Sequence, residues 1–179
     1  MILLSLSDFI DGKYNLPSAS SSISANDTEF QSYIDDNEKK YIYLLLGIEL
    51  GDLLIAYIQA SGTGNAAFEK IKNPFAEQNN IMFSNSNFIQ SLGLKEYLKA
   101  CIFYEYKKDM YTESISGTVK SSAEVSIDLS ASAVLRKAER VFNSILGTVE
   151  AIQSVCEDTT IYPLYKGSRI AVKGHQFFL

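Results

Sequence analysis

The sequence has little with which to build a catalytic or metal site. It contains no tryptophan and a single histidine, His175, near its C-terminal end. One histidine excludes a metal site made of several histidines and argues against a Ser-His-Asp type of catalytic centre. The two cysteines, Cys101 and Cys156, lie far apart without a CxxC pattern, so we expect buried free thiols in a reducing compartment. We therefore expect no enzyme activity, no metal and no cofactor.

Long hydrophobic runs are also missing. No stretch approaches the roughly 20 apolar residues that span a bilayer, and MILLSLSDFI lacks the basic residues that open a signal peptide. We expect a protein that is soluble and intracellular where it is made, with no membrane partner. The pair Gly62 and Gly64 lacks the Gly-Lys-Ser/Thr that completes a phosphate-binding loop, and it predicts only a flexible turn.

The chain is acidic, with a formal net charge of -5, although its last residues are basic. Positions 159–179 contain Lys166, Arg169 and Lys173 and no acidic residue. The rest of the chain is therefore more acidic than the whole, which argues against binding to a phosphate backbone. An acidic protein of this kind could still surround DNA without binding it tightly.

Apolar residues recur at helical spacing in four segments. The predicted helices cover residues 26–46, 50–58, 87–112 and 131–155. Gly47 lies where a residue of positive φ would end the first helix, so the first two helices should form an αα-hairpin with a tight corner. Between the second and third helices the sequence is poorly defined: AAFEKIK fits one or two helical turns, and NNIMFSNSN is typical of a loop.

Before the last helix the pattern changes to a period of two. Val125, Ile127 and Leu129 alternate with polar residues, which predicts a strand, and Ile115 and Val119 could supply its partner. We therefore expect a β-hairpin over about residues 114–130. Because a lone hairpin is marginal in water, it should lie on the helices or on another chain.

Together these patterns predict a mainly α fold: a four-helix bundle with an inserted β-hairpin and an extended arm at each end. The Ser-rich stretch around Pro17 is typical of a linker and should hold residues 2–10 away from the body. The predicted division is an N-terminal arm and linker (1–25), a helical domain (26–158) and a C-terminal docking arm (159–179).

The C-terminal arm has three interpretations: a disordered end, a contact with nucleic acid or membrane, or a segment that docks on another subunit. We favour docking, because the arm combines positive charge with large apolar side chains. Basic residues would meet an acidic neighbour, Ile170 and Val172 would alternate as a short strand, and the last three residues would fill an apolar pocket. The predicted interface comprises Val125, Ile127, Leu129, Lys166, Arg169, Ile170, Val172, Lys173, Phe177, Phe178 and Leu179.

The stretch YIDDNEKKYIYLLLGIELGDLL, residues 33–54, resembles the first helix-turn-helix of phage head-to-tail connector (adaptor) proteins. The matching positions are Ile34, Glu38, Tyr41, Leu46, Gly47, Leu50 and Asp52. The opening LLSLSDFIDGKYNLPSAS resembles the N-terminal arm of that group. An aromatic third helix, the Ser-rich insertion and a long final helix then follow in the same order. The resemblance covers nearly the whole chain, most weakly at 61–87, and is nearest to the neck ring proteins of crAss-like and related Bacteroides phages.

This resemblance implies a structural virion protein with no catalytic residues. Such proteins form a ring, commonly dodecameric, below the portal and extend the DNA channel toward the tail. The implied partners are other copies of the chain, the portal protein, neighbouring neck and tail ring proteins, and double-stranded DNA that passes without sequence-specific binding. The implied locations are the virion neck and, during assembly, the host cytoplasm. The alternatives are a stopper or tail-completion ring lower in the neck, an assembly chaperone or binding module outside the virion, and an enzyme of unknown type.

Overall fold

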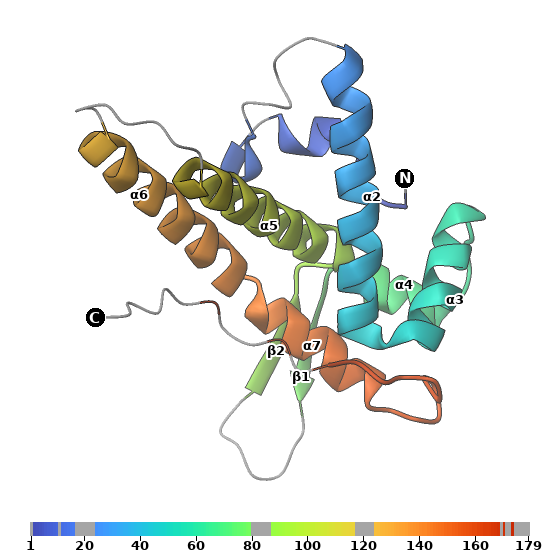
Figure 1. The fold of residues 1–179 in the computed structure, drawn as a ribbon. Helices are drawn as coiled ribbons and strands as arrows, with labels where there is room; N and C mark the ends of the chain where they lie inside the picture. Colours follow the sequence, from blue (N-terminus) through green and yellow to red (C-terminus); the bar gives the residue numbers. More distant parts are fainter. Residues whose placement is uncertain are drawn as a thin grey trace.

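The computed structural model describes residues 2–10, 12–16, 24–79, 87–116, 124–168, 170 and 173, and it is mainly helical (Figure 1). The α-helices are α2 (Ser24–Leu46), α3 (Ile48–Gln59), α4 (Ala66–Lys72), α5 (Leu94–Ser116), α6 (Glu124–Asn143) and α7 (Leu146–Cys156). Two short 3-10 helices, η1 (Leu6–Phe9) and η2 (Gly12–Tyr14), precede α2. The strands β1 (Phe75–Asn79) and β2 (Asn87–Ser91) form a small antiparallel sheet. The predicted mainly α class is therefore confirmed.

The corner between α2 and α3 turns at Gly47, as predicted. Gly47 has φ 85° and ψ 164°, a backbone region that is essentially restricted to glycine. Its N–H still donates to the carbonyl oxygen of Tyr43 at 2.8 Å, so α2 keeps its hydrogen-bond ladder up to the corner. A Cβ atom at this position would also lie 2.9 Å from Cβ of Lys166. Backbone conformation and space therefore both require glycine here.

The β-hairpin predicted over residues 114–130 is wrong. Helix α5 runs on to Ser116 and α6 begins at Glu124, so Val125, Ile127 and Leu129 belong to a helix. Residues 117–123, which include Val119 of the predicted partner strand, lie outside the described part. The alternation at 125–129 is short, and no glycine or proline separates it from the helical pattern that follows. A helix that has started there extends cheaply, and α6 packs along α5 (Figure 1).

The sheet of the structure lies instead where the sequence was poorly defined. Phe75 pairs with Ser91 and Asn79 with Asn87, in antiparallel register. The first residues of the predicted third helix therefore form β2, and α5 begins only at Leu94. A two-stranded sheet needs support, which α7 gives by packing against β2. The short helix expected in AAFEKIK is confirmed as α4.

The long helix predicted over residues 131–155 is two helices. It is interrupted at Ser144 and Ile145, where Ser144 Oγ donates to the carbonyl oxygen of Val141 at 2.7 Å. A serine that bonds back to the preceding turn competes with the helical ladder and bends it. Ile145 is buried at the break, so the change of direction lets α6 pack on α5 while α7 packs on β2 and α2.

The core lies where α2, α5, α6 and α7 meet. Its large buried side chains include Leu45, Tyr97, Leu98, Phe142 and Ile152. Polar atoms in this core are paired: Tyr97 Oη donates to a backbone carbonyl of α2 at 3.1 Å. Within the described residues, every buried side-chain nitrogen or oxygen has a hydrogen-bond partner, as a stable interior requires.

Candidate functional site: two terminal segments docked on the helices

Residues 2–16, described at 2–10 and 12–16, contain a compact unit, which we call the N-terminal plug. Ser5 precedes η1 and is bonded to Asp8 within it: the N–H of Ser5 donates to Asp8 Oδ2 at 3.1 Å, and the N–H of Asp8 donates to Ser5 O at 3.0 Å. The N–H of Leu16 donates to the carbonyl oxygen of Phe9 at 2.8 Å and closes the segment on itself. The plug thus carries local structure of its own.

Apolar side chains anchor the plug between α2 and α5. The buried ones are Leu4, Phe9, Tyr14 and Leu16. The Phe9 ring meets Phe30 of α2 edge-to-face with centroids 6.0 Å apart, and the Tyr14 ring meets Phe103 of α5 at 6.1 Å. The expectation that residues 2–10 stand away from the body is therefore wrong: these apolar side chains find their burial on the helices.

The side chain of Glu38 in α2 binds the backbone at the start of the plug. Its carboxylate is fully buried and accepts the N–H groups of Ile2, Leu3 and Leu4 at 3.0, 2.9 and 2.7 Å. Hydrogen bonds to a carboxylate are strong, and they compensate much of the cost of burying it. Burial nevertheless raises the pKa of Glu38 above its usual value, against the opposing effect of the three N–H donors.

Glu38 was not predicted as a site residue, although the sequence contains a signal for it. It lies one helical turn after Ile34 and about one turn before Tyr41 and Ile42, all of them buried. A carboxylate on the apolar face of a helix needs a buried partner. The sequence could not show that the partner is the chain's own N-terminal backbone.

Two ion pairs fix the plug to the first turn of α5. Asp8 Oδ1 lies 2.8 Å from Lys95 Nζ, and Glu96 Oε2 lies 3.3 Å from Lys13 Nζ. Tyr14 Oη also donates to Glu96 Oε2 at 3.0 Å. Burial acts to raise the pKa of Asp8, but the hydrogen bond from Lys95 and other interactions outweigh it, so the pKa lies below its usual value.

The other end of the chain also docks on its own body. Residues 162–173, described at 162–168, 170 and 173, form what we call the C-terminal strap. It begins at Tyr162, whose ring is buried and whose Oη donates to the carbonyl oxygen of Ala67 in α4 at 2.9 Å. This contact joins the strap to α4.

The strap then caps the end of α2. The N–H of Lys166 donates to Leu46 O at 3.0 Å, and the N–H of Ser168 donates to Leu44 O at 2.8 Å. The last carbonyls of a helix have no partner within the helix. The strap supplies two of these partners from a distant part of the chain.

The side chain of Asn143 binds the backbone of Lys173, at the far end of the strap. Its Nδ2 donates to the carbonyl oxygen of Lys173 at 2.7 Å, and its Oδ1 accepts the N–H of Lys173 at 2.9 Å. The Lys173 ammonium lies 5.4 Å from the ring centre of Phe142 and 5.7 Å from that of Tyr104, within cation–π range. Asn143 therefore recognises backbone, while the rings recognise the charge.

The predicted interface residues of the C-terminal arm have intramolecular partners where the structure describes them. Lys166 Nζ lies 3.3 Å from Glu49 Oε1, and Ile170, which lies in no strand, packs against the core. Arg169, Val172, Phe177, Phe178 and Leu179 lie outside the described residues. Contact of the arm with another subunit stays a prediction.

Three apolar side chains near the α2–α3 corner are exposed to water. Ile48 is 65% exposed, and Leu44 and Leu53 are exposed on either side of it in the sequence. Tyr43 Oη donates to Asp52 Oδ1 across the same corner and ties α2 to α3. The corner thus leaves apolar side chains in contact with water beside a turn that this hydrogen bond ties together.

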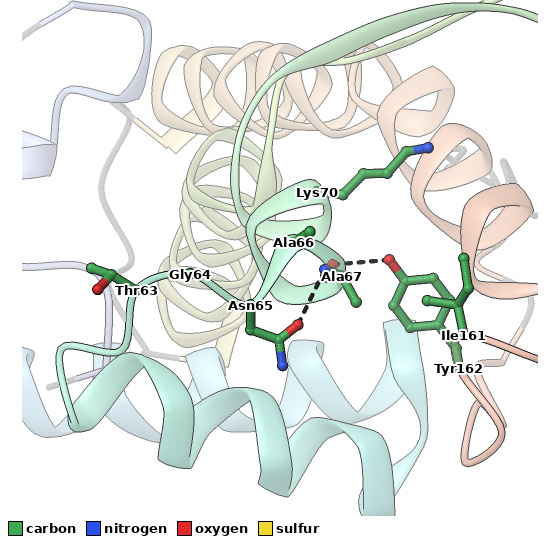
Figure 2. Close-up of a pocket in the computed structure, with 8 residues that line it drawn as sticks. All are labelled: Thr63, Gly64, Asn65, Ala66, Ala67, Lys70, Ile161 and Tyr162. Atoms are coloured by element: carbon green, nitrogen blue, oxygen red, sulfur yellow. Dashed lines mark hydrogen bonds between the residues drawn. The ribbon is translucent and has the colours of Figure 1, made fainter.

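A surface pocket of about 750 Å³ lies beside the strap, between α4 and the loop before it (Figure 2). Asn65 Oδ1 accepts the N–H groups of Ala67 and Phe68, so it caps α4. Tyr162 Oη points at the carbonyl of Ala67 and is already bonded. The polar groups of Asn65 and Tyr162 therefore serve the fold.

Both cysteines are free and buried, as predicted. Burial raises the pKa of the Cys156 thiol to about 12 and that of Cys101 well above its usual value. Neither thiol is therefore activated as a nucleophile. Among the described residues, no group of three or more His, Cys, Asp or Glu side chains could hold a metal ion.

Of the helices in the described part, none combines the length and the apolar character that a bilayer crossing needs. Comparison of the chain with protein-family models, curated proteins and solved structures gives no match.

Proposed function

We propose that the protein is a structural virion protein that forms an oligomeric ring below a phage portal. The ring joins head to tail, extends the DNA channel and is built from a connector-type helical bundle. The observation that carries this proposal is the α2–α3 corner, where the chain resembles adaptor proteins. Leu46 and Leu50 of that stretch are buried on either side of Gly47, and Asp52 accepts the hydrogen bond from Tyr43.

Two surface properties support the same proposal. The apolar side chains exposed at the corner, with Ile48 foremost, suit a contact between subunits. The acidic net charge suits a channel through which DNA slides, because fixed negative charge repels the phosphate backbone.

The test is to measure the mass of the protein in solution, alone and mixed with a portal protein from the same phage. We expect a ring of uniform size, formed alone or on the portal. A monomer that ignores the portal would contradict the proposal, and a ring that binds only lower neck or tail proteins would favour the stopper alternative.

Paired variants locate the contact. Ile48→Asp should abolish ring formation without changing the urea midpoint of unfolding, because the side chain is exposed in the single chain. Val134→Asp, at an exposed apolar position of α6, is the matched control and should assemble normally. If both variants assemble like the wild type, the corner is not the contact.

A further inference from the structure

The N-terminal plug is attached to α2 by one covalent connection, residues 17–23. Its non-covalent contacts with α2 and α5 hold it in place. On α2 they include Glu38 and Phe30, and on α5 they include Lys95, Glu96 and Phe103. A second copy of the chain carries the same plug and offers the same contacts.

The plug is built to bind as a unit. Its internal hydrogen bonds between Ser5 and Asp8, and between Phe9 and Leu16, hold its shape. A segment with structure of its own loses less conformational entropy on binding than a disordered one. The contacts that seat it combine apolar anchors, a backbone clamp and two ion pairs, so they also specify its register.

The groove that receives the plug is costly to leave empty. Without the plug, the Glu38 carboxylate would lose the three N–H donors that it has in the structure, and the ring of Phe103 would lose its contact with Tyr14. The best replacement is a segment with three successive free N–H groups, apolar side chains at matching positions, and an acid and a lysine placed for Lys95 and Glu96. Residues 2–16 of another copy meet every one of these requirements.

We propose that the plug exchanges between copies, so that residues 2–16 of one subunit fill the groove between α2 and α5 of its neighbour. This inference rests on the self-association proposed above. Each subunit then gives one plug and offers one groove, which is a head-to-tail contact of the kind that closes into a ring. The seven residues 17–23 reach at most about 25 Å, so the neighbouring groove must lie within that distance of the start of α2.

The ion pairs of the plug allow a test with the unmodified full-length chain. Protein labelled with nitrogen-15 and unlabelled protein are unfolded together in urea, refolded, separated by size and treated with a carbodiimide. This reagent joins a carboxylate to an amine in direct contact, such as Asp8 with Lys95 at 2.8 Å and Lys13 with Glu96 at 3.3 Å. Mass spectrometry then shows whether each linked pair of peptides comes from one isotope or from both.

With equal amounts of the two proteins, complete exchange and random assembly, about half of the links from Asp8 to Lys95 and from Lys13 to Glu96 should join one labelled and one unlabelled peptide. Links within one subunit, such as Lys40 with Glu105, should always join peptides of the same isotope and serve as an internal reference. An oligomer in which every link between plug and groove also joins peptides of the same isotope would overturn the exchange and leave the ring proposal standing. A protein that stays monomeric, alone and with the portal, would overturn both. Lys95→Arg is the control: it keeps the charge but cannot be coupled, so of these two links between plug and groove only the one from Lys13 to Glu96 should persist.

Discussion

The seating of the C-terminal strap on α2 can be tested with one added methyl group. A Cβ atom at Gly167 would lie 2.1 Å from the carbonyl oxygen of Leu45 and 2.6 Å from the ring of Tyr165. The first of these atoms is backbone inside a helix and cannot move cheaply. Gly167 does not have a positive φ, so the effect of Gly167→Ala is steric and not conformational. We expect the strap to lift from the end of α2.

The cost follows from the hydrogen bonds that the strap makes there. Lifting it removes the bonds from the N–H groups of Lys166 and Ser168 to the carbonyls of Leu46 and Leu44. At about 0.5–1.5 kcal/mol each, their loss should lower the free energy of unfolding by about 1–3 kcal/mol. With a urea dependence of about 2 kcal/mol per molar, the midpoint of unfolding should fall by about 0.5–1.5 M.

Gly147→Ala is the matched control. Gly147 lies in α7, where an added Cβ would meet nothing within 4 Å. Alanine is the better helix former, so the free energy of unfolding of this variant should equal that of the wild type or exceed it by up to about 1 kcal/mol. Trypsin should cut after Lys166 and Lys173 faster in Gly167→Ala than in either other protein. Equal midpoints and equal cleavage rates in all three proteins would refute the docking of the strap on α2.

Three further outcomes follow from the plug and the buried thiols. Burial raises the pKa of Glu38 above 4.5, so the folded chain binds a proton at this carboxyl more tightly than the unfolded chain does. Protonation of Glu38 therefore stabilises the fold at low pH, and this contribution is lost as pH rises through the raised pKa. Urea titrations at several pH values should therefore show the free energy of unfolding of the wild type falling relative to that of Glu38→Gln as pH rises from 4.5 through the raised pKa. If the free energies of both proteins change in parallel with pH, the burial of this carboxylate is contradicted. Leu3→Pro removes a donor to Glu38 and should destabilise the chain by about 1.5–3 kcal/mol more than an N–H-preserving Leu3→Ala, so equal urea midpoints would show that backbone recognition is unimportant. Cys101 and Cys156 should resist a thiol reagent until urea unfolds the chain, and rapid labelling of the folded protein would show that they are not buried.

The sequence predicted those features that short stretches determine. The run of leucines before Gly47 indicated both the end of α2 and the tight corner, because only glycine readily adopts the conformation that the corner requires. AAFEKIK was also recognised as a possible short helix, and the structure shows that Asn65 caps it from the position immediately before it.

The features that the sequence did not predict depend on distant contacts. At Val125, Ile127 and Leu129 a short alternation favoured a strand, but the backbone there is helical and α6 packs along α5. The pairing of β1 with β2 depends on α7, which follows much later in the chain. The Ser-rich connection after the plug was visible in the sequence, whereas the docking of the plug depends on distant residues, among them Glu38 in the middle of α2.

Both ends of the chain are held by side chains that recognise backbone. Glu38 accepts successive N–H groups of the plug, and Asn143 both donates to and accepts from the backbone of Lys173. Such contacts depend little on the identity of the residue that they hold, so the gripping residues on the helices should tolerate substitution less well than the terminal residues. The same property makes the terminal segments transferable, because a groove that reads backbone accepts the matching segment of any identical copy. In a ring of identical subunits, contacts that first complete the single chain can therefore also join neighbours.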